Sequence, residues 1–192
     1  MSVTETNTER GIVNGVDLDQ LTATIEAVRG ERTLGEVTFS VEGEWEDGFK
    51  LRSATGALTQ AGQKDASRAG KFEMRSDEPA SLLGTDTAVS PAEYVLQALA
   101  GCYTVTLTAN AAARNIELKS YKLQLEADFD LASFLGIAPE ENPGASQIRV
   151  TVELDAPTAT REELEDLVET VQQRSPIRDT LIRPVDVVTT LA

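Results

Sequence analysis

A stretch of twenty residues without a charged side chain, Tyr94–Ala113, constrains the fold of this chain more than any other feature. The stretch is as long as a membrane span, but it contains glutamine, asparagine and three threonines, and only five of its residues are Val or Leu. Apolar residues occur all round it, which is typical of a helix in a protein core or a subunit interface. The T-V-T-L-T alternation within it leaves a strand as the alternative.

The start of this helix is marked by Ser90 followed by Pro91, an N-cap residue and a first-turn proline. The helix is then predicted to run to about Ala113. Small residues along it allow a second helix to approach closely, and we therefore hypothesise that the chain dimerises through this helix. These residues are Ala98, Ala100, Gly101, Ala109, Ala111, Ala112 and Ala113.

The rest of the sequence predicts short helices and antiparallel strands. Apolar residues recur at helical spacing over 17–30 and again after Thr160, each time behind a capping-box pair. Alternating apolar residues predict a hairpin around Asp47-Gly48 and strands over 121–129, 148–154 and 185–191. Connections too short for crossover helices favour an α+β fold, an antiparallel sheet covered by helices. No glycine-rich phosphate-binding motif follows a predicted strand.

The length of 192 residues fits one compact domain. We expect a disordered tail over residues 1–16 and a single domain over 17–192. The N-terminal residues lack the basic and apolar runs of a signal peptide. Cys102 is the only cysteine and forms no disulfide within one chain, which favours a reducing, cytoplasmic compartment.

The absence of histidine excludes an imidazole base and histidine-ligated metals. The net charge of −15 disfavours nucleic acid and anionic membranes as partners. No calcium-binding loop is present, and we expect neither a metal nor another cofactor. Only five of the 17 basic residues are lysines. Such an acidic surface is consistent with a halophilic protein or with an ordinary acidic one, and unfolding at low salt would distinguish the two.

Cys102 lies twelve residues after Ser90, about 18 Å along the predicted helix. The helix dipole does not reach that far, because its effect fades within the first turn. By its position alone, Cys102 is a small buried side chain without reactivity. A reactive thiol at this place needs a nearby cation.

The segment Ser90–Thr104, with the sequence SPAEYVLQALAGCYT, resembles the signature of the OsmC and organic hydroperoxide resistance superfamily. Trp45 with its hairpin, the SDEP run at 76–79 and the QQRSP run at 172–176 follow in that family's order. The resemblance covers about residues 35–191 and implies that 17–34 are a helical addition. It also implies an intertwined homodimer, with its central helices back to back and two sites shared between the subunits.

The resemblance implies that Cys102 stands at the position of the thiol that attacks the peroxide in the family's peroxidases. In those enzymes a second cysteine resolves the resulting sulfenic acid, and an arginine and a glutamate hold the thiolate. Ser175 occupies the resolving position here. Ala92 occupies the glutamate position, and Glu93 follows one residue later, about 100° further round the helix.

Arg75 is the best match to the family's arginine, and Arg52 and Arg68 are alternatives. Three of the candidate residues also have purely structural interpretations. Ser175 precedes a proline and is a potential N-cap, Glu93 is a first-turn acid, and Arg75 is a strand residue that water can solvate.

Three functions fit these observations. In the first, the protein reduces organic hydroperoxides in oxidative stress defence, and an external thiol recycles its single cysteine. In the second, a non-catalytic family member binds a small hydrophobic ligand at the dimer interface. In the third, Cys102 oxidises without turnover and acts as a redox sensor.

Overall fold

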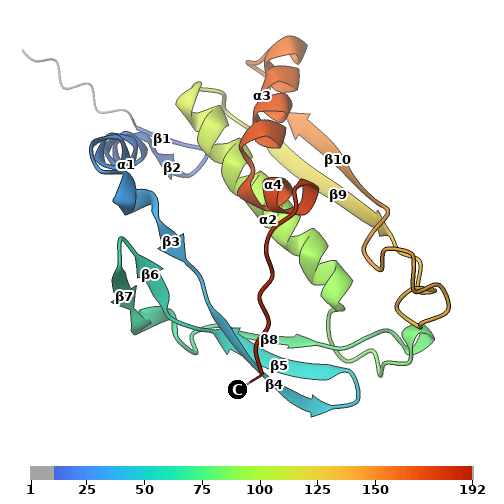
Figure 1. Ribbon diagram of the computed structural model, residues 1–192. Helices are drawn as coiled ribbons and strands as arrows, with labels where there is room; N and C mark the ends of the chain where they lie inside the picture. Colours follow the sequence, from blue (N-terminus) through green and yellow to red (C-terminus); the bar gives the residue numbers. More distant parts are fainter. Residues whose placement is uncertain (1–10, 192) are drawn as a thin grey trace, which may run out of the picture. The chain divides into compact units, whose positions relative to one another are not determined.

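A computed structural model describes residues 11–191 and shows a mixed α+β fold with antiparallel sheets, as the sequence predicts (Figure 1). The sequence predicts one domain over 17–192, whereas the described chain divides into two compact units. The first comprises residues 11 and 17–94, and the second comprises 12–16 and 95–191. Residues 1–10 of the tail expected over 1–16 lie outside the described residues.

The first unit opens with helix α1, Leu18–Gly30, which begins where the sequence predicts. The carboxylate of Asp17 caps it by accepting hydrogen bonds from the N–H groups of Asp19 and Gln20, at 3.0 and 2.9 Å. A 3₁₀ turn, Arg32–Gly35, leads into a three-stranded antiparallel sheet of order β3-β6-β7. Its strands are β3 (Val37–Thr38), β6 (Leu58–Gln60) and β7 (Gln63–Asp65).

The other sheet of this unit has the order β4-β5-β8, with strands Val41–Asp47, Lys50–Thr55 and Glu73–Ser76. The predicted hairpin joins β4 to β5, and Gly48 adopts the positive φ of 54° that its turn requires. Trp45 pairs with Leu51 on one face, and Arg52 pairs with Arg75 on the opposite face. Trp45 remains 69% exposed, so the face of the sheet on which it lies is not covered by the rest of this unit.

A buried carboxylate, Asp77, organises the loop between β8 and the central helix. It accepts hydrogen bonds from the hydroxyls of Thr85 and Thr87, at 2.6 and 2.8 Å, and from the N–H groups of both residues and of Glu78. The bond from the Thr85 hydroxyl is the largest of the effects that hold the pKa of Asp77 far below its ordinary value. Gly84 packs so closely on the Glu78 backbone that a side chain there has no room.

The long helix α2, Pro91–Ala113, is the uncharged stretch of the sequence, and the helical prediction for that stretch is confirmed. Its residues from Val95 onward belong to the second unit. There the helix buries Leu99, Tyr103, Leu107 and Ala111, which recur every fourth residue and so share one face.

Two antiparallel strands and two further helices complete the second unit. The strands are β9 (Ser120–Asp128) and β10 (Gln147–Asp155), and both agree closely with the predicted ranges. Helix α3, Arg161–Arg174, starts at the predicted capping box of Thr160 and Glu163. Its buried residues Leu167 and Val171 join the core formed by α2, and the inner faces of both strands pack against that core. Helix α4, Pro176–Ile182, follows after a single residue.

The segment before α1 is more ordered than the sequence analysis expects, because residues 12–17 form the strands β1 (Ile12–Val13) and β2 (Val16–Asp17). Between them Asn14 and Gly15 adopt φ values of 52° and 77°, which suit a two-residue hairpin turn. The Asn14 side chain donates to the carbonyl of Ile116 at 2.8 Å and accepts from the N–H of Leu118 at 2.9 Å. These two bonds fix the turn, and the Asn-Gly pair was the signal for it.

The strand predicted over Val185–Leu191 is absent from the described structure. Residues 184–191 make no backbone hydrogen bond to the rest of residues 11–191. Val187 and Val188 are 87% and 85% exposed. The sequence has the residues of a strand, but a strand also needs a neighbouring edge, and this segment has none within the described chain.

We expect Asp77→Asn to lower the melting temperature by about 5 °C near neutral pH, because a neutral amide cannot accept all the hydrogen bonds that the loop donates. The folded-state pKa of Asp77 lies below that of the unfolded chain. Its contribution is therefore complete above about pH 4 and is lost as the pH falls through the folded value.

Thermal unfolding between about pH 7 and pH 3 tests this expectation, with Glu78→Gln as a control that removes a charge from the same loop. The deficit of Asp77→Asn should shrink toward pH 3. A constant deficit, or an equal loss in Glu78→Gln, would contradict the role assigned to Asp77.

Candidate functional site

Cys102 lies near the middle of α2, at the border between its buried and exposed faces. Its side chain is half-buried, its neighbour Tyr103 is buried, and Gly101 before it is exposed. The sequence suggested a buried side chain, and the structure instead shows one of intermediate exposure. Its carbonyl accepts a hydrogen bond from the Thr106 hydroxyl at 2.8 Å.

The nearest polar partner of that thiol is Ser175. The two are 73 positions apart in the sequence, yet Ser175 Oγ lies 3.2 Å from Cys102 Sγ, a hydrogen-bonding distance for oxygen and sulfur. Ser175 is only 1% exposed. Of the four residues proposed for the site, the structure thus brings these two together within one unit.

Ser175 is also the single residue that connects α3 to α4. Its N–H donates to the carbonyl of Val171 at 3.0 Å, at the end of α3. Its Oγ accepts the N–H of Arg178 at 3.3 Å and so caps α4, and Pro176 fills the first position of that helix. The structural interpretation of Ser175 as an N-cap is therefore confirmed, and the contact with the thiol exists alongside it.

Polar side-chain contacts also hold α3 against α2. Arg114, at the end of α2, donates to Asp166 and to the Thr170 hydroxyl, both at 2.6 Å. Arg174 donates to the side-chain oxygen of Asn110 on α2 at 3.1 Å. Because α3 is held on both sides of the core residues Leu167 and Val171, the position of Ser175 relative to Cys102 is determined by the packing of two helices.

Tyr103, the residue after Cys102, has both the thiol and the guanidinium of Arg178 in its surroundings. Burial raises the pKa of Tyr103, the nearby Arg178 guanidinium opposes this increase, and the Cys102 side chain is close enough to add to it. Arg178 also donates to the carbonyl of Gln172 at 3.0 Å. The sequence analysis did not identify Arg178. Its position three residues after Ser175, one helical turn along α4, was the available signal.

Tyr121 is a further aromatic side chain that packs against the core of this unit. It lies on β9, and its hydroxyl oxygen is buried close to the Thr104 side chain of α2. Burial also raises the pKa of Tyr121. Tyr121 thus adds a second aromatic side chain of raised pKa next to Tyr103.

Glu93 is engaged at the start of α2. Its Oε2 accepts the N–H of Ser90 at 2.9 Å, while its own N–H donates to Ser90 Oγ at 3.2 Å. This reciprocal pair is a capping box. The structural interpretation of Glu93 as a first-turn acid therefore applies, and within the first unit the carboxylate serves the helix end.

The three candidate arginines all belong to the first unit. Arg75 lies exposed on β8, and its guanidinium has no ion-pair or hydrogen-bond partner among residues 11–191. Arg52 pairs with Glu44 at 3.3 Å and with Glu46 at 3.8 Å. Arg68 lies over the ring of Phe72. Arg75 is therefore the one of the three whose charge is uncompensated in the described structure.

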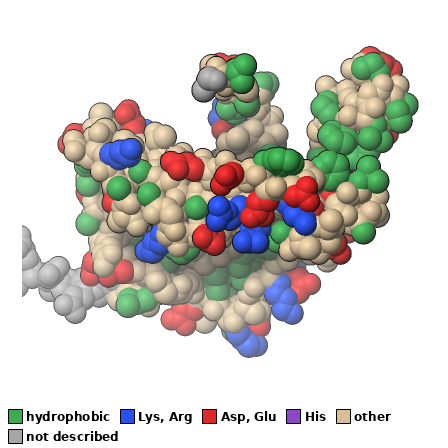
Figure 2. All heavy atoms as spheres, turned by 90° about the horizontal axis from the view of Figure 1, so that it is seen from below, with side chains coloured by type: hydrophobic (Ala, Val, Ile, Leu, Met, Phe, Trp, Pro, Cys, Tyr) green, Lys and Arg blue, Asp and Glu red, His purple; other side chains and the backbone are tan. Residues whose placement is uncertain are grey.

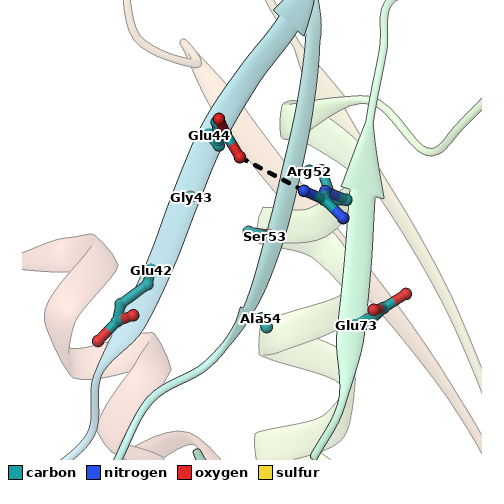
Figure 3. A pocket seen from close by; sticks show the side chains of 7 residues that line it. All are labelled: Glu42, Gly43, Glu44, Arg52, Ser53, Ala54 and Glu73. Carbon is teal, nitrogen blue, oxygen red and sulfur yellow. Dashed lines mark hydrogen bonds and ion pairs between the residues drawn. The ribbon is translucent and has the colours of Figure 1, made fainter. Parts of the chain in front are cut away.

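A hollow of about 380 Å³ adjoins Arg75, and its lining includes Lys50 and Thr87. Another hollow, of about 310 Å³, lies over the β4-β5-β8 sheet (Figure 3). Three glutamates and Arg52 surround it, and the dashed line in Figure 3 marks the pair between Arg52 and Glu44. Neither lining contains a thiol, so neither hollow has a group that can reduce a peroxide.

The described residues also limit what else the site can hold. No group of three or more His, Cys, Asp or Glu side chains within residues 11–191 is arranged to bind a metal ion. None of the described helices is both long and apolar enough to cross a membrane. Figure 2 shows acidic and basic side chains intermingled on one face of the molecule, with hydrophobic side chains exposed among them.

Comparison with known proteins places these features in context. The family model described as OsmC-like protein matches residues 84–190, which include α2, Cys102 and Ser175. No curated protein sequence matches the chain.

Solved structures share the fold at low sequence identity. An OsmC-like protein from Mycoplasma pneumoniae has a TM-score of 0.59 and 16% identity, over 76% of this chain and 87% of that one. An organic hydroperoxide resistance protein OsmC from Legionella pneumophila has a TM-score of 0.53 and 14% identity, over 75% and 88%. A putative osmotic stress induced and detoxification response protein from Psychrobacter arcticus has a TM-score of 0.55 and 11% identity, over 74% and 88%.

We expect Ser175→Cys to form a disulfide with Cys102 under mild oxidation, because the side-chain atoms at these positions are 3.2 Å apart and a small shift brings two sulfurs to about 2.05 Å. The measurement is the number of free thiols in unfolded protein, with the mass before and after oxidation. Oxidised monomer should show none, against one in the wild type. Thr170→Cys, on the same helix, is the control and should keep both thiols. Two free thiols in oxidised Ser175→Cys would contradict the geometry.

Proposed function

The chain belongs to the OsmC-like protein family, and from this premise we propose that it reduces organic hydroperoxides with Cys102 as its single reactive thiol. The observation that carries the proposal is the contact between a half-exposed Cys102 and the buried Ser175 hydroxyl. Family resemblance expects a resolving cysteine where Ser175 stands. A hydroxyl in that place contacts the thiol but cannot form a disulfide with it.

The first step consumes one hydroperoxide. The Cys102 thiolate attacks the distal peroxide oxygen, the O–O bond breaks as the S–O bond forms, and the leaving alkoxide takes a proton to become an alcohol. The sulfur is oxidised to a sulfenic acid and the peroxide is reduced. The intermediate exposure of Cys102 suits this step, because the substrate must reach the sulfur.

Two external thiols complete the cycle. The first attacks the sulfenic acid, forms a mixed disulfide with Cys102 and releases water. The second attacks the mixed disulfide, releases Cys102 as a thiol and leaves as an external disulfide. Ser175 has no thiol with which to compete for the sulfenic acid, so a low-molecular-weight or protein thiol is the co-reactant.

A homodimer belongs to the same proposal and rests on two exposed apolar features. On α2, Val105 is 70% exposed, next to the small exposed residues Ala98 and Gly101. In the C-terminal segment, Val187 and Val188 are exposed and have strand-forming character, without a sheet edge to join within residues 11–191. A second copy of the chain offers both a facing α2 and a sheet edge.

We expect purified protein to consume an organic hydroperoxide such as cumene hydroperoxide in the presence of a dithiol, and Cys102→Ser to lose at least about 100-fold of this activity. Turnover is measured as peroxide consumed per protein. Without any thiol, the wild type should consume about one equivalent and stop, with a gain of one oxygen on Cys102.

Two outcomes would overturn the proposed function. A wild type that consumes no hydroperoxide with any thiol reductant would support the binding alternative, above all if a hydrophobic ligand copurifies. Stoichiometric oxidation that no external thiol reverses would support the redox sensor. Thr106→Ser, on the same helix, is a control that keeps Cys102 and should retain activity.

We expect the wild type to sediment as a dimer and Val105→Asp to shift it toward the monomer. A new charge on an exposed face is tolerated in a monomer but is costly in a buried interface. Thr158→Asp adds the same charge to an exposed loop and should remain dimeric.

Sedimentation at low and at molar salt also tests halophily, because the charge of −15 on each copy opposes association most at low salt. A monomeric wild type at both salt concentrations would contradict the dimer.

A further inference from the structure

We propose that Ser175 is the positioning residue of Cys102: its hydroxyl donates a hydrogen bond to the sulfur and thereby favours the thiolate in a fixed orientation. This inference rests on the proposed function in naming the thiolate as the reacting form. It goes beyond that function by giving the residue at the resolving position a task of its own, in addition to its role as an N-cap.

The direction of the hydrogen bond follows from the other partner of Ser175 Oγ. The N–H of Arg178 donates to that oxygen at 3.3 Å, which occupies a lone pair and leaves the hydroxyl proton free. The neighbour at 3.2 Å in the remaining direction is Cys102 Sγ. An oxygen that already accepts a hydrogen bond is a better donor, so the cap on α4 strengthens the bond to the sulfur.

The backbone of Ser175 is held at both ends. Its N–H donates to Val171 and its carbonyl accepts from Asp179, both at 3.0 Å. With the N-cap bond, every polar group of the residue is engaged, and only the hydroxyl proton can turn. The donor therefore does not need to be ordered when the thiol ionises, which is the condition under which a hydrogen bond stabilises a charge most.

The burial of Ser175 strengthens the hydrogen bond that its hydroxyl donates. Ser175 is 1% exposed, so water does not compete for its hydroxyl, and a bond to a charged acceptor in such a place is stronger than one at the surface. The titratable group shown close to the thiol is Tyr103 on α2, and Tyr103 in turn has Arg178 of α4 and Tyr121 of β9 as neighbours. Neither tyrosine is ionised near neutral pH, and Arg178 favours an anion, so none of them opposes the effect of Ser175.

The test is the pH dependence of Cys102 alkylation by iodoacetamide in the folded wild type and in Ser175→Ala. The pH midpoint of alkylation should rise by about one unit in the variant, a loss of about tenfold in thiolate at any pH below both midpoints. Ser175→Thr keeps the hydroxyl and should restore the wild-type midpoint. An unchanged midpoint in Ser175→Ala would overturn the proposal.

Loss of the α4 cap is controlled separately. Ser175→Gly keeps a residue that is tolerated at an N-cap but removes the hydroxyl, and its midpoint should match that of Ser175→Ala. Thr160→Ala removes the cap of α3 without touching the thiol and should leave the midpoint unchanged. A shift in Thr160→Ala as large as that in Ser175→Ala would reduce the effect to general destabilisation and overturn the proposal.

Alkylation needs no peroxide, so the two proposals fail independently. A raised midpoint in Ser175→Ala together with no hydroperoxide consumption by the wild type would support the positioning role and overturn the proposed function. Hydroperoxide consumption by the wild type with equal midpoints in both proteins would do the opposite.

Discussion

The packing of one face of α2 is the constraint on which the second unit depends. Leu99, Tyr103, Leu107 and Ala111 lie at four-residue intervals, and the inner face of the β9–β10 pair and the buried side of α3 pack against them. Because the helix has no charged residue over its central turns, it presents no side chain that needs solvent on the packed face. Everything near Cys102 is placed by this contact. The thiol lies one residue before a core side chain, and Ser175 lies at the end of the helix that covers the same core.

The junction between α3 and α4 shows how a local rule of helix structure produces a chemical contact. A helix end requires a cap, a serine before a proline is well suited to it, and the short connection forces the cap residue against α2. Ser175 Oγ accepts the capping hydrogen bond and donates the one to the sulfur, so a single hydroxyl serves both contacts. The sequence presented these as competing interpretations of Ser175, and the structure combines them.

Elements with a strong local pattern were predictable from the sequence. Helices α1 and α3 begin at their predicted caps, and α2, β9 and β10 follow from periodicity. The predictions that failed concern segments whose structure depends on contacts distant in the sequence. The Asn14 turn is stabilised by Ile116 and Leu118, and the predicted strand over 185–191 lacks a neighbour within the described chain. Arg178 was missed for a similar reason, because only the packing of α4 brings it near Tyr103.

A single sulfur beside a hydroxyl also changes what controls the oxidation state of the protein. A pair of cysteines has a reduction potential of its own, set by the strain and stability of its internal disulfide. Cys102 faces an oxygen that cannot form a disulfide, so any disulfide of Cys102 is formed with a thiol from outside the chain. The balance between free and oxidised Cys102 therefore follows the concentration and redox poise of the surrounding thiols, and the fold fixes only how readily the sulfur is reached.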